Sequence, residues 1–303
     1  MTVLRALESI RNPFLDCLFI VISHLGAEVV SVIAAFVIYW CVSRKKGFFV
    51  LANIVFGAGL CQTLKMFFSV PRPFVKYPDF AIVEGARSTA AGNSFPSGHS
   101  QNSTSLFGSL AVLFRNRIAR ILCVVMIALV IFSRMYLGAH YPTDVLAGFI
   151  CGIAVLAFMS FLFGRFGDRT NFIPALFGIG GLILLFVELM FEFGPWKGIP
   201  DPENMHDMLK SVGIFTGSAL AIAVGNLIER RYVRFDTEAV WWAQILKCAA
   251  GLGLFGVLLI LMKIPVQALF GDACIGYVVR FFFPGLFAVC VWPMVFRRLP
   301  RKR

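Results

Sequence analysis

Residues 143–164 read TDVLAGFICGIAVLAFMSFLFG, and no residue from Val145 to Phe163 carries a charge. About 20 apolar residues in a helix cross the hydrocarbon core of a bilayer, so this stretch predicts a membrane span. The whole chain has the same character, because 59% of its 303 residues are hydrophobic and 15% are charged, with a mean hydropathy of +0.82. Soluble domains have about 25% charged residues. The composition therefore excludes a soluble globular, a disordered and a fibrous protein.

Nine apolar segments predict an all-α polytopic membrane bundle of about nine transmembrane helices. The segments are 25–43, 47–68, 99–114, 118–137, 143–164, 172–192, 211–228, 240–262 and 273–296. Residues 3–23 mix charged and apolar positions at helical spacing. This pattern predicts a helix lying in the membrane interface, or alternatively the beginning of a longer first span.

The basic residues predict the orientation of the spans. Sixteen of the 28 lie in alternate loops and in the tail: Arg44, Lys45, Lys46, Arg115, Arg117, Arg120, Arg165, Arg169, Arg230, Arg231, Arg234, Arg297, Arg298, Arg301, Lys302 and Arg303. Cytoplasmic loops are enriched in lysine and arginine, so we expect these loops and the C-terminus to be cytoplasmic. The acidic loop with Asp201, Glu203 and Asp207 would then lie outside. The net charge of +12 mostly reflects these basic loops and the orientation of the spans, so it predicts no nucleic-acid partner.

The eight cysteines lie mostly in apolar runs and form no CxxC pair, which predicts neither a disulfide framework nor a metal site.

Three polar clusters adjoin the spans on the predicted outer side. The first, KMFFSVPRP, runs from Lys65 to Pro73. Pro71 and Pro73 cannot continue a helix, so Arg72 should leave on an extended segment. Alone, such a cation pair is more often an interfacial fringe of the membrane.

The second cluster, NSFPSGHS, occupies residues 93–100 directly before a predicted span. Ser97 can cap the helix, and Gly98 lets a ligand approach its backbone closely. The free amides and the helix dipole at such an N-terminus form an anion site. An ordinary helix cap is the alternative for this stretch alone.

The third cluster, SRMYLGAHYPTD, occupies residues 133–144. Proline favours the first helical position, so Pro142 predicts Tyr141 as N-cap and Asp144 as the third helical residue. The Asp144 carboxylate could then hold one ring nitrogen of His140 and leave the other nucleophilic. A capped helix beside an interfacial histidine is the alternative.

Together the three clusters resemble the motifs K-x6-RP, PSGH and SR-x5-H-x3-D of the type 2 phosphatidic acid phosphatase superfamily. The resemblance spans residues 65–144 with every motif position filled, and it implies a six-helix catalytic core. The nine predicted spans are similar to the layout of the glucose-6-phosphatase and sphingosine-phosphate phosphatase branches. We therefore expect an interfacial helix at 1–24, a catalytic membrane core at 25–192, and three additional spans with a basic tail at 193–303.

The resemblance implies a role for each motif residue. His140 would attack phosphorus, Asp144 would orient it, and His99 would act as acid and then base. Lys65, Arg72, Ser97, Gly98 and Arg134 would bind the phosphoryl oxygens. Fixed cations and amides also suit the charge that develops in phosphoryl transfer, and three cations make a metal or other cofactor unnecessary.

The expected function is metal-independent hydrolysis of a lipid phosphate monoester or pyrophosphate on the non-cytoplasmic face of a membrane, the plasma membrane in a bacterium. The alternatives are a phosphatase for a soluble ester such as a sugar phosphate, and a non-enzymatic lipid scramblase or transporter. The particular lipid and the oligomeric state stay open.

Three further charges lie within predicted spans outside these motifs. Glu188 and Glu192 are one helical turn apart at the outer end of one span, and Arg280 lies inside the last. Ionisable residues at such depth normally face protein or a water-filled cavity. We expect Arg280 to pair with Glu188 and to shape a vestibule, with a purely structural ion pair as the alternative.

Overall fold

The computed structural model describes residues 1–167, 171–194 and 202–300, and it confirms the all-α prediction, since this part of the chain contains helices and no strand. The helices are α1 (Thr2–Ser9), α2 (Pro13–His24), α3 (Glu28–Val37), α4 (Arg44–Phe68), α5 (Pro73–Lys76), α6 (Glu84–Arg87), α7 (Gly98–Leu113), α8 (Arg117–Tyr136), α9 (Pro142–Phe166), α10 (Phe172–Phe193), α11 (Pro202–Ile228), α12 (Trp241–Leu261), α13 (Lys263–Phe270) and α14 (Ile275–Leu286). Short π- and 3₁₀-helical turns, η1 (Ile38–Val42), η2 (Glu229–Val233), η3 (Phe287–Val291) and η4 (Trp292–Arg298), extend α3, α11 and α14. Arg169, Asp201 and the tail from Arg301 lie outside the described residues, as do the side-chain surroundings of Glu203.

Seven helices in the described ranges are long and apolar enough to cross a membrane, and a bent pair of helices makes an eighth candidate. The seven are Arg44–Lys76, Arg117–Tyr136, Pro142–Phe166, Phe172–Phe193, Met205–Val233, Trp241–Phe270 and Ile275–Arg298. The bent pair joins α2 to the helix Glu28–Val42 at 48°. The predicted nine spans are therefore not confirmed. The segment predicted at 99–114 forms α7, whose 16 residues begin with a polar run and do not qualify as a span.

The polar start of α7 is buried in protein. The residues Ser100 to Ser105 are each 1% exposed or less. α7 packs against α4, α8 and α9, and Asn102 donates hydrogen bonds to the carbonyl of Gly26 and to the hydroxyl of Ser31. Buried polar groups need such partners, so α7 is stable only inside the bundle.

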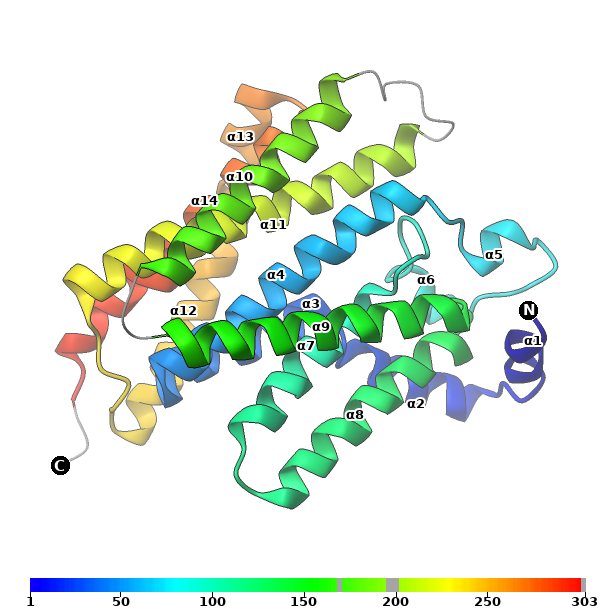
Figure 1. Ribbon diagram of the computed structural model, residues 1–303, viewed down its shortest axis with the longest axis horizontal. Coiled ribbons are helices and arrows are strands. Elements are labelled where there is room, and N and C mark those ends of the chain that lie inside the picture. Colours follow the sequence, from blue (N-terminus) through cyan, green and yellow to red (C-terminus); the bar gives the residue numbers. More distant parts are fainter. Residues whose placement is uncertain (168–170, 195–201, 301–303) are drawn as a thin grey trace.

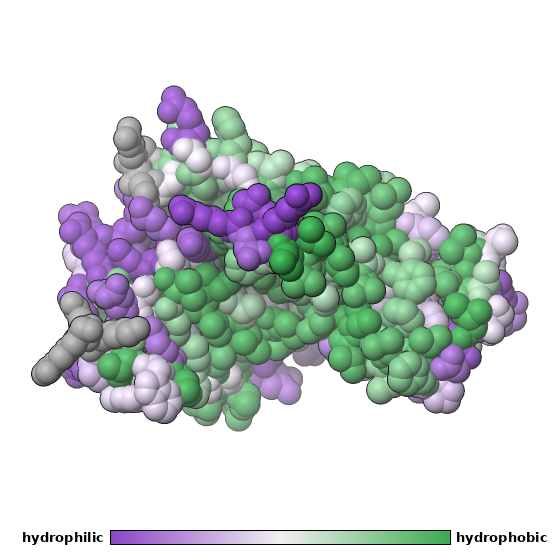
Figure 2. Space-filling view, turned by 90° about the horizontal axis from the view of Figure 1, so that it is seen from below, coloured by the Kyte–Doolittle hydropathy of each residue, from purple (hydrophilic) through white to green (hydrophobic). Residues whose placement is uncertain are grey.

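The two ends of the bundle differ in character. In Figure 1 the N-terminus, α5 and α6 lie at the right end, and the C-terminus lies at the left end. Figure 2 shows a wide hydrophobic surface over much of one face, with hydrophilic residues gathered mainly at the left end, in a strip over the upper middle and in smaller groups at the right end. This distribution is typical of a protein whose middle is surrounded by lipid.

The last helices pack onto the rest of the bundle through α11. α11 contacts α10, α14 and α4, and Figure 1 shows it running alongside α4. Small residues allow the close approach, because a side chain on Gly217 would collide with the carbonyl of Val278 on α14. The C-terminal helices are therefore in direct contact with the helix that carries Lys65.

Candidate active site

His140 and Arg72 meet where the chain enters α9 and α5. Nη1 of Arg72 lies 3.1 Å from Nε2 of His140, and its other bonds go to the carbonyls of Ala139, Gly92 and Ala91. A guanidinium can only donate, so Nε2 of His140 must be the acceptor. The neutral tautomer therefore carries its proton on Nδ1 and presents a lone pair on Nε2, the form required of a nucleophile.

Asp144 is fixed by its own helix start, as the sequence predicted. Tyr141 is the N-cap of α9, and Oδ2 of Asp144 accepts the Tyr141 backbone N–H at 2.9 Å. Nδ1 of His140 lies 3.6 Å from the same oxygen, which is beyond a normal hydrogen bond. Ser94 lies between them, since its hydroxyl donates to Oδ2 of Asp144 and is 3.4 Å from Nδ1 of His140.

Two further cations face the same site. Lys65 is 6% exposed, and its Nζ donates to the carbonyl of Asn93 at 3.0 Å. Arg134 is fully buried, and its Nη1 donates to the hydroxyls of Ser23 at 2.7 Å and Thr89 at 3.2 Å. Its Nε has no hydrogen-bond partner within the described residues.

The N-terminus of α7 provides the opening of the site. Ser97 is the N-cap, as predicted, and its hydroxyl accepts the backbone N–H of Ser100. A side chain on Gly98 would meet nothing within 4 Å, so open space lies in front of this backbone. Nε2 of His99 is buried and has no hydrogen-bond partner in the described part of the chain. The free amides, the unpartnered imidazole and the open space together suit an anion.

The electrostatics of the site favour a neutral His140. Burial lowers the pKa of His140 well below its ordinary value, and the charges of Arg72, Arg134 and Lys65 lower it further. Burial and the charges of the same three cations also lower the pKa of His99 well below its ordinary value. The structure thus brings together all eight motif residues, which are Lys65, Arg72, Ser97, Gly98, His99, Arg134, His140 and Asp144.

Three residues that contact this set were not singled out from the sequence. Ser94 contacts His140 and Asp144, Asn93 holds Lys65, and Ser23 holds Arg134. Asn93 and Ser94 lie within the polar stretch of residues 93–100, so the sequence could have indicated both as site residues. Ser23 lies some 110 residues from Arg134 in sequence, and only a polar residue within an apolar run marked it.

The predicted pair of Arg280 and Glu188 does not form among the described residues. Nε of Arg280 donates to the carbonyl of Leu259 on α12, whereas Glu188 points at Gly213 on α11 with both carboxylate oxygens unpartnered in the described chain. The reason is helical phase, because the side of α14 that carries Arg280 faces α12 and α13. Oε1 of Glu192 accepts the backbone N–H of Cys274. A vestibule formed by Glu188, Glu192 and Arg280 stays a prediction.

The fold and the site define a helical membrane protein with a buried site lined by histidines, arginines and a lysine. Two family models match the chain, "PAP2 superfamily" over residues 46–168 and "PAP2 superfamily phosphatase, transmembrane extension" over residues 213–303. The chain belongs to the PAP2 superfamily of membrane phosphatases.

Several named proteins are similar to the chain. A lipid A 4'-phosphatase of Porphyromonas gingivalis is 32% identical over 159 residues, which are 49% of this chain and 66% of that protein. Undecaprenyl-diphosphatase BcrC of Bacillus subtilis is 30% identical, covering 52% of this chain and 78% of that protein. Phosphatidylglycerophosphatase B of the same species is 32% identical, covering 49% and 75%.

A crystal structure of a transmembrane PAP2-type phosphatidylglycerolphosphate phosphatase from Bacillus subtilis is 28% identical. It covers 56% of this chain and 86% of its own, with a TM-score of 0.46. The similarity to glucose-6-phosphatase expected from nine spans is not confirmed, because the described helices provide seven or eight candidates.

Proposed function

We propose that this protein hydrolyses a phosphate monoester or pyrophosphate of a membrane lipid through a phosphohistidine on His140. The observation that carries the proposal is the lone pair of His140 Nε2, which faces Arg72 in a site with two more cations. A phosphoryl group that binds between Arg72 and His140 would contact both the attacking nitrogen and a positive charge that stabilises its oxygens.

In the first step, Nε2 of His140 attacks phosphorus, and the bond between phosphorus and the ester oxygen breaks. The leaving oxygen takes a proton from His99, whose protonated form is favoured by the negative phosphate beside it. Nδ1–H of His140 faces Ser94 and Asp144, so the imidazolium that forms is stabilised by the Asp144 carboxylate.

In the second step, the neutral His99 accepts a proton from water. The resulting hydroxide attacks phosphorus, the bond to Nε2 breaks, and inorganic phosphate leaves. His99 is again protonated and His140 is again neutral. The sum is one ester and one water converted to one alcohol and one phosphate.

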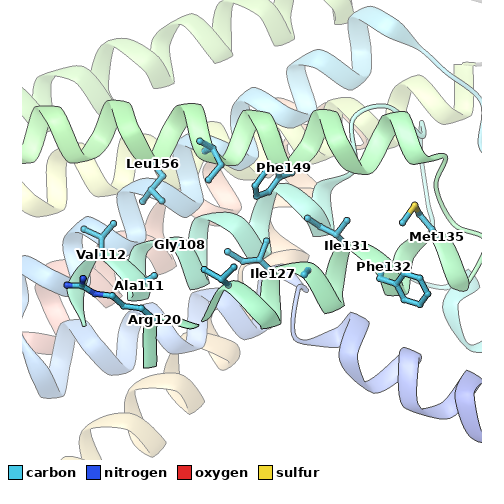
Figure 3. Close-up of a pocket in the computed structure, with 13 residues that line it drawn as sticks. Gly108, Ala111, Val112, Arg120, Ile127, Ile131, Phe132, Met135, Phe149 and Leu156 are labelled. Carbon is cyan, nitrogen blue, oxygen red and sulfur yellow. The ribbon is translucent and has the colours of Figure 1, made fainter. Parts of the chain in front are cut away.

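An apolar groove supports a lipid as the substrate. The groove has a volume of about 830 Å³ and lies between α7, α8 and α9. In Figure 3 Ile127, Ile131, Phe149 and Leu156 line its middle, Arg120 is at one end, and Met135 is at the other. From Arg120 to Met135 a helix rises roughly 22 Å. Met135 and Arg134 lie at the same end of α8, so this groove extends toward the end of the bundle that carries the candidate site.

The names of the relatives also support a lipid substrate, because all three are phosphatases of lipid-linked phosphates.

We further propose that the site faces the non-cytoplasmic side. The loops before α7 and α9 lie at one end of the bundle, and α7, α9 and α11 end toward the other end (Figure 1). Many of the basic residues counted above lie at or just beyond these helix ends. The positive-inside rule makes the second end cytoplasmic.

The test is phosphate release by the purified protein in lipid nanodiscs. The substrates are phosphatidate, phosphatidylglycerol phosphate, a polyprenyl pyrophosphate, sphingosine phosphate, lipid A and glucose 6-phosphate. We expect the highest kcat/KM with one of the lipids. Hydrolysis of glucose 6-phosphate alone would replace the lipid proposal by the soluble-ester alternative. Lipid translocation without any hydrolysis would favour a scramblase.

A further inference from the structure

The surroundings of Lys65 connect the phosphate site to the C-terminal helices. Nζ of Lys65 donates to the backbone carbonyl of Asn93 at 3.0 Å, and Nδ2 of Asn93 donates to the backbone carbonyl of Lys65 at 3.1 Å. Asn93 thus holds both the amine and the backbone of Lys65. A side chain as long as lysine has several rotatable bonds, so two fixed points restrict where its charge lies.

Asn93 is itself contacted from α11. Its Nδ2 donates to Sδ of Met208 at 3.0 Å, and Met208 is 3% exposed. Met208 belongs to a buried cluster that joins α4, α10, α11 and the start of α14. Its members are Met66, Phe191, Met205, Met208, Leu209, Val212 and Cys274. α11 continues into the part of the chain that matches the transmembrane extension.

We propose that Met208 is a positioning residue for Lys65 and acts through Asn93. The inference rests on the proposed function to the extent that Lys65 binds the phosphoryl group. It gives the C-terminal helices a part in the reaction, because α11 supplies an acceptor to the loop that fixes a phosphate-binding cation. The sulfur is the feature required, since leucine would fill a similar volume but could not accept a hydrogen bond.

Met205 provides a matched control. It lies one helical turn before Met208, in the same cluster, and is 8% exposed. Met205→Leu and Met208→Leu therefore make the same change in the same packing environment, and only Met208→Leu removes an acceptor from Asn93. A difference between the two variants reports the hydrogen bond.

The experiment measures the Kd of inorganic phosphate by calorimetry, KM and kcat for the preferred lipid, and the thermal midpoint, all on the full chain in nanodiscs. We expect Met208→Leu to raise Kd and KM about three- to ten-fold, the effect of one buried hydrogen bond, with a smaller change in kcat. Met205→Leu should leave Kd and KM at wild-type values. The two thermal midpoints should differ by no more than the loss of one hydrogen bond explains, because the packing change is the same.

A double-mutant cycle completes the test. Asn93→Ala removes the donor to Met208, so adding Met208→Leu to it should raise Kd no further. Equal Kd values for Met208→Leu and Met205→Leu, or additive effects in the double variant, would overturn the proposal. A wild-type protein that binds phosphate but hydrolyses none of the esters would refute the proposed function and leave this comparison of Kd values intact.

Discussion

Nε2 of His140 lies 3.1 Å from Nη1 of Arg72, so the nitrogen proposed as the nucleophile is covered by one of the cations proposed to bind the substrate. The contact fixes the tautomer of His140 from one side, and Ser94 and Asp144 fix it from the other. Phosphate binding must therefore move Arg72 from nitrogen to oxygen. Substitution of each group around the imidazole should therefore have its own effect on the kinetics.

Removal of the nucleophile should stop the reaction. We expect His140→Ala to lower kcat by at least about 10⁴-fold, because no neighbouring group can replace Nε2. Asp144→Asn should keep a small residual rate, because an uncharged amide sets the tautomer poorly and stabilises the imidazolium less. Phosphate release and a rapid alkaline quench for phosphohistidine measure both effects. A phosphoenzyme in His140→Ala would contradict the assignment.

Ser94 should act on kcat through His140. Ser94→Ala leaves Nδ1 of His140 with only the Asp144 carboxylate, at 3.6 Å, while the contact of Nε2 with Arg72 is unchanged. We expect kcat to fall about 10- to 100-fold, the effect of one hydrogen bond to a charged group, with KM little changed. Ser103→Ala is the control, because Ser103 is a buried serine of α7 that bonds the carbonyl of Ser100 instead. Similar kinetics in both variants would exclude this role for Ser94.

Ser23 should act on substrate binding through Arg134. Ser23→Ala removes the 2.7 Å bond to the Arg134 guanidinium, so the cation becomes less well placed. We expect KM to rise about 10-fold and kcat to change less. Ser31→Ala, on the same bent pair of helices, removes a bond to Asn102 and should leave KM unchanged. The idea fails if the two serine variants have the same KM.

Activity should persist in EDTA. Lys65, Arg72 and Arg134 already surround the site with positive charge, which is the contribution that a divalent ion makes in other phosphoryl-transfer sites. The measurement is kcat/KM before and after dialysis against EDTA, followed by addition of magnesium. A loss that only the added metal restores would refute metal independence.

Labelling should place the site outside the cytoplasm. In a cysteine-free variant, Ser88→Cys should react with an impermeant thiol reagent added to intact cells, and Arg115→Cys should react only after lysis. Both positions are exposed, so accessibility within the protein does not distinguish them. The reverse pattern would put the catalytic end in the cytoplasm.

Much of the site was predictable because its parts are local. Pro142 and Asp144 lie within one helix start, so the Tyr141 cap followed from the preference of proline for the first turn. The cap at Ser97 and the extended backbone at Arg72 followed from similar rules. Apolar length alone predicted seven of the helices, since a span needs only its own residues to be recognised.

The tertiary structure alone decided the contacts between distant segments. The structure places Ser94 between His140 and Asp144, Ser23 on Arg134, and Met208 on Asn93. Each contact depends on how loops and helices that are distant in sequence pack together. Helical phase also turned Arg280 toward α12 and away from Glu188. The sequence determines the periodicity of each helix and the residues at its ends. Which faces of two helices meet depends on packing over the whole bundle, and no single segment contains that information.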